Sequence, residues 1–152
     1  MNGIVIIGHG NFGSGLNSTL ELIAGKYDFV KYGDFTSEKS PEEFKEEVKL
    51  ELEKLKDKEK IFFFTDVVGG TPFKVACELK LEDDRIEVFY GTNMAMIIET
   101  CMNSQFEIEL DNDSIAQIGK SNIDSFRLTK KNQTQEMAEE GRTMHHCVGG
   151  YH

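Results

Sequence analysis

Short apolar runs alternate along this chain with segments in which apolar residues recur every three or four positions. The runs at 4–7, 61–65 and 86–90 have the length and composition of buried strands, and 29–35 is a weaker example. Helical spacing follows each run; in the first such segment Leu16, Leu20 and Ile23 share a face, and Gly25 is expected to end the helix. The alternation predicts an α/β fold with a mostly parallel open sheet, right-handed crossovers and helices on both faces.

The segment after residue 39 gives the clearest helix signal in the chain. Ser40 and Glu43 form a capping box, and Pro41 occupies the first helical position. Its apolar face is marked by Phe44, Val48, Leu52 and Leu55. The opposite face carries charges of both signs one turn apart, which is typical of a helix face exposed to solvent.

Two later helices also have recognisable starts. Thr71 is predicted to be the N-cap of a helix that begins with Pro72, and Asn93 precedes the next helix. The core-facing residues expected of these helices are Phe73, Val75, Ala76 and Leu79 in the first, and Met94, Ile97, Ile98, Cys101 and Met102 in the second. A short helix is expected around residues 115–118.

Polar turns follow three of the predicted strands. His9 lies between two glycines after the first strand, Asp66 follows the third, and Asn93 follows the fourth. Because parallel strands deliver their carboxyl ends to one edge of a sheet, these turns are expected to converge there. Each has a simpler explanation alone: a surface histidine, a turn-forming aspartate, a helix cap. Their joint placement favours a site.

Composition and charge narrow the class of protein. The chain has 152 residues, 39% of them hydrophobic, which suffices for one buried core. It contains no apolar run of membrane-spanning length and no signal-peptide pattern, and its three cysteines form no CxxC pair, so a cytoplasmic location is expected. The net charge of −10 argues against a nucleic-acid partner and favours a protein partner with a basic face.

The converging residues suit phosphoryl transfer. One nitrogen of a neutral imidazole can attack phosphorus, while a carboxylate on the other nitrogen fixes the tautomer and stabilises the positive charge that develops. His9 is the candidate nucleophile and Asp66 its partner. The N–H groups of Gly10, Gly69 and Gly70, with the Thr71 hydroxyl, are the expected phosphate-binding groups.

Three motifs, in the same order and with similar spacing, resemble the IIA domains of the mannose family of the sugar phosphotransferase system (PTS). The resemblance covers residues 1 to about 130. The motifs are Gly8-His9-Gly10, then Phe64-Thr65-Asp66 followed by Gly69-Gly70-Thr71-Pro72-Phe73, and Gly91-Thr92-Asn93-Met94 with Ile97-Ile98-Glu99-Thr100.

The resemblance implies a phosphoryl relay. His9 would accept phosphate from the phosphocarrier protein HPr and pass it to a IIB domain, which phosphorylates a sugar entering through membrane IIC and IID subunits. Asp66 would be the supporting aspartate and Thr71 the phosphate-contacting hydroxyl, with no metal, nucleotide or other cofactor. The family also implies a homodimer that exchanges a late edge strand, which by position is residues 125–129 here.

The sequence departs from the family pattern after the aspartate. Relatives often have threonine and tryptophan there, whereas this chain has Val67 and Val68, so the partner contacts of this loop are expected to differ. The phosphotransfer subunit of dihydroxyacetone kinases shares the fold and the histidine, but its first turn usually reads Ser-His-Ser. A nonenzymatic regulatory or binding module of the same fold is a further alternative.

The resemblance ends near residue 130. Residues 131–152 form a polar extension that is expected to be disordered or loosely helical, or an addition foreign to the natural domain. It ends in a group of potential metal ligands, namely His145, His146, Cys147 and His152. Their spacing matches no closed structural zinc site, so no metal is expected.

Overall fold

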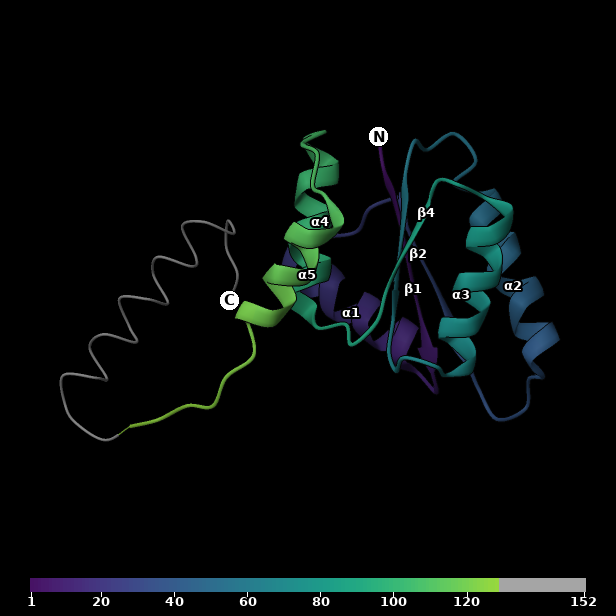
Figure 1. Cartoon of the computed structure of the whole chain (residues 1–152), viewed down its shortest axis with the longest axis horizontal. Coiled ribbons are helices and arrows are strands. Elements are labelled where there is room, and N and C mark those ends of the chain that lie inside the picture. The colour runs from purple at the N-terminus through teal and green to yellow at the C-terminus, as the bar shows by residue number, and fades with distance from the viewer. Residues whose placement is uncertain (129–152) are drawn as a thin grey trace.

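The computed structural model describes residues 1–128, which form an open sheet covered by helices (Figure 1). The strands are β1 (Gly3–His9), β2 (Val30–Phe35), β3 (Ile61–Thr65) and β4 (Ile86–Phe89). The helices are α1 (Phe12–Ala24), α2 (Pro41–Glu53), α3 (Thr71–Glu82), α4 (Met94–Gln105) and α5 (Asn112–Ser121). The strand order is β2-β1-β3-β4 and every pairing is parallel, which confirms the predicted class.

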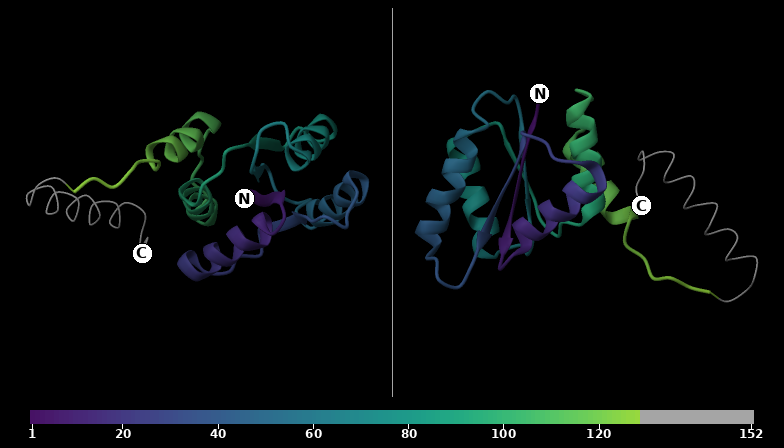
Figure 2. Two further views of the ribbon diagram at one scale, coloured as in Figure 1. Left: turned by 90° about the horizontal axis from the view of Figure 1, so that it is seen from below. Right: turned by 180° about the vertical axis from the view of Figure 1, so that it is seen from behind.

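The helices cover both faces of the sheet. Ile4 and Ile6 of β1 pack into a core cluster with α1, α4 and α5, whereas Val5 and Ile7 pack into a second cluster with α2 and α3. Figure 2 shows the same division, with α2 and α3 on one side of the strands. Successive side chains of a strand point to opposite faces of the sheet, so the position of His9 in β1 determines which pair of helices it faces.

Local sequence signals explain where most helices begin. The Ser40 side chain accepts a hydrogen bond from the Glu43 N–H, and the Glu43 side chain reciprocates, so the capping box is confirmed. Asn93 caps α4 by accepting from the Met96 N–H. The predicted cap of α3 was wrong by one residue. Gly70 holds the extended cap conformation, and Thr71 is already helical.

The end of the described chain differs from the expected edge strand. Within residues 125–128 no strand forms in the single chain, and this segment leads away from the sheet (Figure 1). Thr129 and the predicted extension at 131–152, with its potential metal ligands, lie outside the described residues. Across residues 1–128, no helix combines the length and apolarity needed to cross a bilayer.

Candidate active site

The last residue of β1 is His9, whose side chain is 47% exposed. It has the same parity as Val5 and Ile7, so it lies on the face of the sheet covered by α2 and α3. The turn after it is pinned to the neighbouring strand, because the Gly10 N–H donates to the Phe35 carbonyl at 2.8 Å. The histidine is therefore presented to solvent from a fixed backbone.

Asp66 holds both the main chain and the ring of His9. Its Oδ2 accepts from the His9 backbone N–H at 2.8 Å and lies 2.7 Å from His9 Nδ1. An ionised carboxylate can only accept, so Nδ1 carries a proton, and in the neutral ring Nε2 then has the lone pair. The sequence predicted that these two residues meet, and the geometry confirms it.

The Asp66 carboxyl group is stabilised in its charged form. Its side chain is only 12% exposed. Burial raises the pKa of Asp66, but hydrogen bonds from the His9 main chain, the His9 ring and the Val67 main chain lower it by more, so the pKa falls below its ordinary value. The site thus keeps a negative charge beside the imidazole, where a positive charge would develop on phosphorylation.

Two more residues confine the imidazole. A Cβ atom placed on Gly70 would lie 2.6 Å from His9 Cε1 and 3.3 Å from Nε2, so the absence of a side chain there is what leaves room for the ring. The Phe35 ring contacts the His9 ring edge to face, with centroids 5.9 Å apart, and itself packs on buried Phe44. Gly70 thus lies against the Cε1–Nε2 edge of the ring.

The groups available to bind phosphate differ in part from those predicted. The N–H of Gly10 donates to Phe35 and that of Gly70 donates to the Val67 carbonyl at 3.1 Å, so neither is free in this geometry. In the first turn of α3, Thr71 and Phe73 have N–H groups without an intrahelical acceptor, and Pro72 has no N–H. No bond of the Thr71 hydroxyl is found among residues 1–128. The N-terminus of α3 therefore presents main-chain N–H groups of the kind that bind anions.

Asn93, the third converging residue, has a structural role. Its side-chain oxygen caps α4, and its nitrogen donates to the Gly119 carbonyl at 2.9 Å, which ties α5 to α4. The turn before it supports the site indirectly, since the Gly91 N–H donates to the Asp66 carbonyl at 2.7 Å. The simpler explanation of Asn93, a helix cap, is the one that the structure supports.

Sequence reasoning missed the contribution of β2. Asp34 accepts from both the N–H and the hydroxyl of Ser14, at 2.8 and 2.5 Å, and so holds the first turn of α1 next to the histidine turn. Phe35 supports the imidazole directly. Both follow from the register of β2 on β1, in which Gly8 is level with Asp34 and His9 with Phe35.

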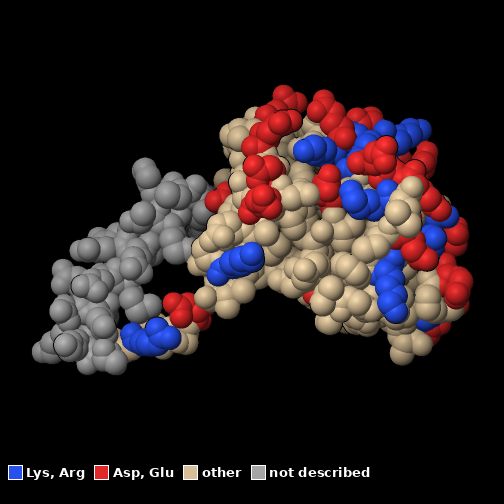
Figure 3. Space-filling model, viewed as in Figure 1, with Lys and Arg blue, Asp and Glu red and all other residues tan. Residues whose placement is uncertain are grey.

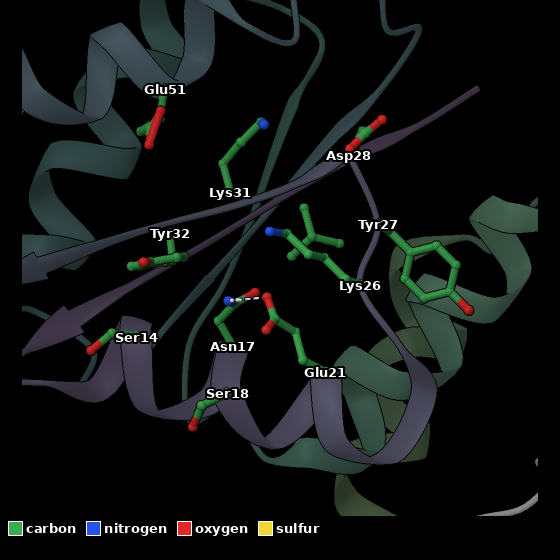
Figure 4. A pocket seen from close by; sticks show the side chains of 11 residues that line it. Ser14, Asn17, Ser18, Glu21, Lys26, Tyr27, Asp28, Lys31, Tyr32 and Glu51 are labelled. Carbon is green, nitrogen blue, oxygen red and sulfur yellow. Dashed lines mark hydrogen bonds between the residues drawn. The ribbon is translucent and has the colours of Figure 1, made fainter.

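The depression along α1 and β2 is separate from the histidine. It has a volume of about 460 Å³ and lies along the β2 edge of the sheet, lined by residues of α1, of β2 and of the loop before it, and by Glu51 of α2 (Figure 4). Asn17 and Glu21 are hydrogen-bonded to each other on its wall, and charges of both signs line it. Within the described chain, no cluster of three or more metal-ligating side chains is present there or elsewhere.

The domain is an open parallel α/β sheet with a histidine–carboxylate pair at its carboxyl edge, an arrangement suited to a phosphoryl carrier. A protein family described as "PTS system fructose IIA component" matches residues 3–118. The chain belongs to this family of PTS IIA components. Members of the family are phosphotransferase proteins.

Individual relatives agree with the family. The mannose-specific EIIAB component of Escherichia coli K12 is 32% identical over 99 residues, which are 65% of this chain and 31% of that protein. The chain thus spans about a third of this longer relative. The fructose-specific EIIA component of Bacillus subtilis is 25% identical, over 65% of this chain and 68% of that one.

The fold matches solved structures closely. The crystal structure of the EIIA component from Streptococcus agalactiae has a TM-score of 0.74 at 32% identity, covering 83% of this chain and 98% of that chain. A PTS IIA protein associated with the fucose utilization operon of Streptococcus pneumoniae has a TM-score of 0.74 at 25% identity, covering 82% and 92%.

Proposed function

We propose that this protein carries a phosphoryl group on His9 Nε2, accepting it from phosphorylated HPr and passing it to a IIB domain in the cytoplasm. The observation that carries the proposal is the shared acceptor Oδ2 of Asp66, which fixes both the ring and the main chain of the histidine. IIC and IID membrane subunits would take part only indirectly, by admitting the sugar that IIB phosphorylates. The family membership supports this role.

The transfer would use the His9 ring, the Asp66 carboxylate and the first turn of α3. The Nε2 lone pair attacks phosphorus, a nitrogen–phosphorus bond forms, and the bond to the donor breaks with its electron pair leaving on the donor. The proton stays on Nδ1, where Asp66 neutralises the charge of the phosphorylated imidazole. The Thr71 hydroxyl and the free N–H groups at the start of α3 hold the phosphoryl oxygens.

A homodimer is part of this proposal. β4 lies at the edge of the sheet, beside a largely apolar groove of about 250 Å³ between β4, α4 and α5. Phe126 and Leu128 are 68% and 57% exposed, and they alternate with polar residues as in a strand with one apolar face. We propose that this segment adds to the β4 edge of a second copy, which would cover both surfaces.

One labelling experiment tests the phosphocarrier role. Incubation with phosphoenolpyruvate, its PTS kinase and HPr is expected to place an acid-labile phosphate on the wild-type protein and none on His9→Ala. Absence of label on the wild type, or equal label on the variant, would contradict the relay.

Sedimentation of the wild type and of a Phe126→Asp/Leu128→Asp variant tests the dimer, which is expected to dissociate in the variant.

A further inference from the structure

Two aliphatic side chains stand exposed beside the histidine site. Val67 and Val68 follow Asp66 directly and are 60% and 55% exposed. Single exposed aliphatic residues are ordinary on protein surfaces. These two are adjacent, and their loop is fixed at both ends, because the Gly91 N–H donates to the Asp66 carbonyl and the Gly70 N–H to the Val67 carbonyl. They are therefore held in place before any partner arrives.

The surface around them lacks charge, although the protein is strongly charged. The chain has 27 acidic and 17 basic residues. Apart from Asp66, the turns after β1, β3 and β4 and the residues next to them, at 9–20, 67–73 and 88–98, contain none of either kind. In Figure 3 the lower margin of the domain, where these strands end, is mostly uncharged, whereas acidic and basic side chains gather above it and over α2 and α3. Depletion of charge marks the centre of protein–protein interfaces.

The turn after β2 is the exception, and its lysine is already engaged. Lys39 donates to the Asp34 carbonyl at 2.8 Å and pairs with Glu47 at 2.8 Å. The uncharged surface therefore extends from the histidine toward β3 and β4 rather than toward β2.

The protein that binds this surface is inferred from the geometry of phosphoryl transfer, and this inference rests on the proposed function. The donor atom must come within about 3–3.5 Å of the reacting group. Val67 and Val68 lie in the loop between Asp66 and Gly70, and both of these flanking residues lie against the imidazole, so a donor protein that reaches Nε2 comes to lie on this loop. We propose that Val67 and Val68 are the apolar anchor of the surface that docks the phosphoryl-donor protein. The matching surface of the donor is uncharged and partly apolar around its phosphorylated residue.

Two properties of the protein act on its partner at different distances. The net charge of −10 acts at long range and favours a basic protein during approach. At contact, the exposed Val67 and Val68 side chains favour an apolar surface on the partner instead. The expectation of a basic partner face thus applies outside the docking surface, not at its centre.

A paired measurement tests the anchor. The variant Val67→Thr/Val68→Thr keeps the shape and branching of both side chains and makes them polar. Its control, Leu22→Gln/Leu81→Gln, removes two exposed aliphatic side chains near the far ends of α1 and α3. For each protein, kcat/KM with phosphorylated HPr is divided by the labelling rate with phosphoramidate, a small donor that needs no docking surface.

We expect this ratio to fall about tenfold in the valine variant, as for interface residues worth roughly 1.4 kcal/mol, and to stay within about twofold in the control. An unchanged ratio would overturn the proposal. An equal loss with both donors would also overturn it, because the loop would then act in the chemical step. A change in sedimentation of the valine variant alone would overturn it as well, because Val67 and Val68 would then form a contact between copies of this chain. Wild-type protein that is labelled by phosphoramidate but not by phosphorylated HPr would instead refute the proposed function, and the anchor with it.

Discussion

The Phe35 ring meets the His9 ring edge to face at a centroid distance of 5.9 Å, from the neighbouring strand and at the same register position. Phe35 is in turn packed on the fully buried Phe44 of α2. The His9 ring is thereby coupled to the hydrophobic core through two aromatic contacts. Its ring is oriented by packing as well as by its hydrogen bond.

Replacing Phe35 by leucine should loosen this support. An aromatic pair contributes about 0.5–1.5 kcal/mol beyond its buried area, so we expect phosphoryl transfer to slow by roughly three- to tenfold. NMR of the imidazole nitrogens should show a broadened Nδ1–H signal. Phe106→Leu, at an exposed residue after α4, is the control and should change neither quantity. A normal transfer rate in Phe35→Leu would show that Asp66 alone orients the ring.

Gly70 and Gly69 should respond to alanine in different ways. Gly70 has φ −75°, which any residue adopts, so Gly70→Ala should fold normally and lose transfer by on the order of 100-fold, because the new methyl group displaces the imidazole. Gly69 has φ +84° and open space around it, so Gly69→Ala should lose about 1–2 kcal/mol of unfolding free energy from backbone strain. Urea unfolding and labelling of both variants separate the two effects; a strongly destabilised Gly70→Ala would contradict this assignment.

Asp66→Asn should affect both transfer and the pH dependence of stability. Loss of a hydrogen bond to a charged group costs about 1.5–3 kcal/mol, so transfer should slow by roughly ten- to a hundredfold. The folded-state pKa of Asp66 is lowered. Its stabilisation is therefore complete above the unfolded pKa of about 3.9 and is lost as the pH falls through the lower folded pKa.

The stability difference between wild type and Asp66→Asn, measured by urea unfolding from pH 7 down to pH 2, should accordingly shrink only below about pH 4. A difference that is constant across this range would mean that the carboxylate gains nothing from its contacts with His9.

The capping box of α2 offers a test of stability. Ser40→Ala removes the side chain that accepts from the Glu43 N–H and should lower the free energy of unfolding by about 1 kcal/mol. Ser37→Ala lies just upstream, outside the helix, and should stay within about 0.5 kcal/mol of wild type. Equal losses in both variants would show that the cap adds nothing specific.

The sequence was most informative where a local pattern decides the structure. Apolar runs alternating with helical spacing were enough to predict a parallel sheet, and the shared edge of parallel strands was enough to bring His9 to Asp66. Val67 and Val68 depart from the family pattern in the sequence, and both are exposed in the structure.

Contacts that depend on register or on available space were out of reach. The face that Phe35 occupies follows from its pairing level with His9, which no pattern within residues 29–35 reveals. Both Gly70 and Thr71 are acceptable N-caps by type, and the imidazole against Gly70, which excludes a side chain, is a tertiary feature. The engagement of the Gly10 and Gly70 N–H groups likewise depends on the folded turns.

The contacts that Asp66, Phe35 and Gly70 make around the imidazole have a kinetic consequence under the proposed function. Since the ring need not turn between receiving and giving, the molecule that delivers the phosphoryl group and the molecule that removes it must use the same surface, one after the other. Under the proposed function, transfer should therefore follow ping-pong kinetics. The donor and the acceptor should compete for the same surface, so an excess of either one should slow transfer.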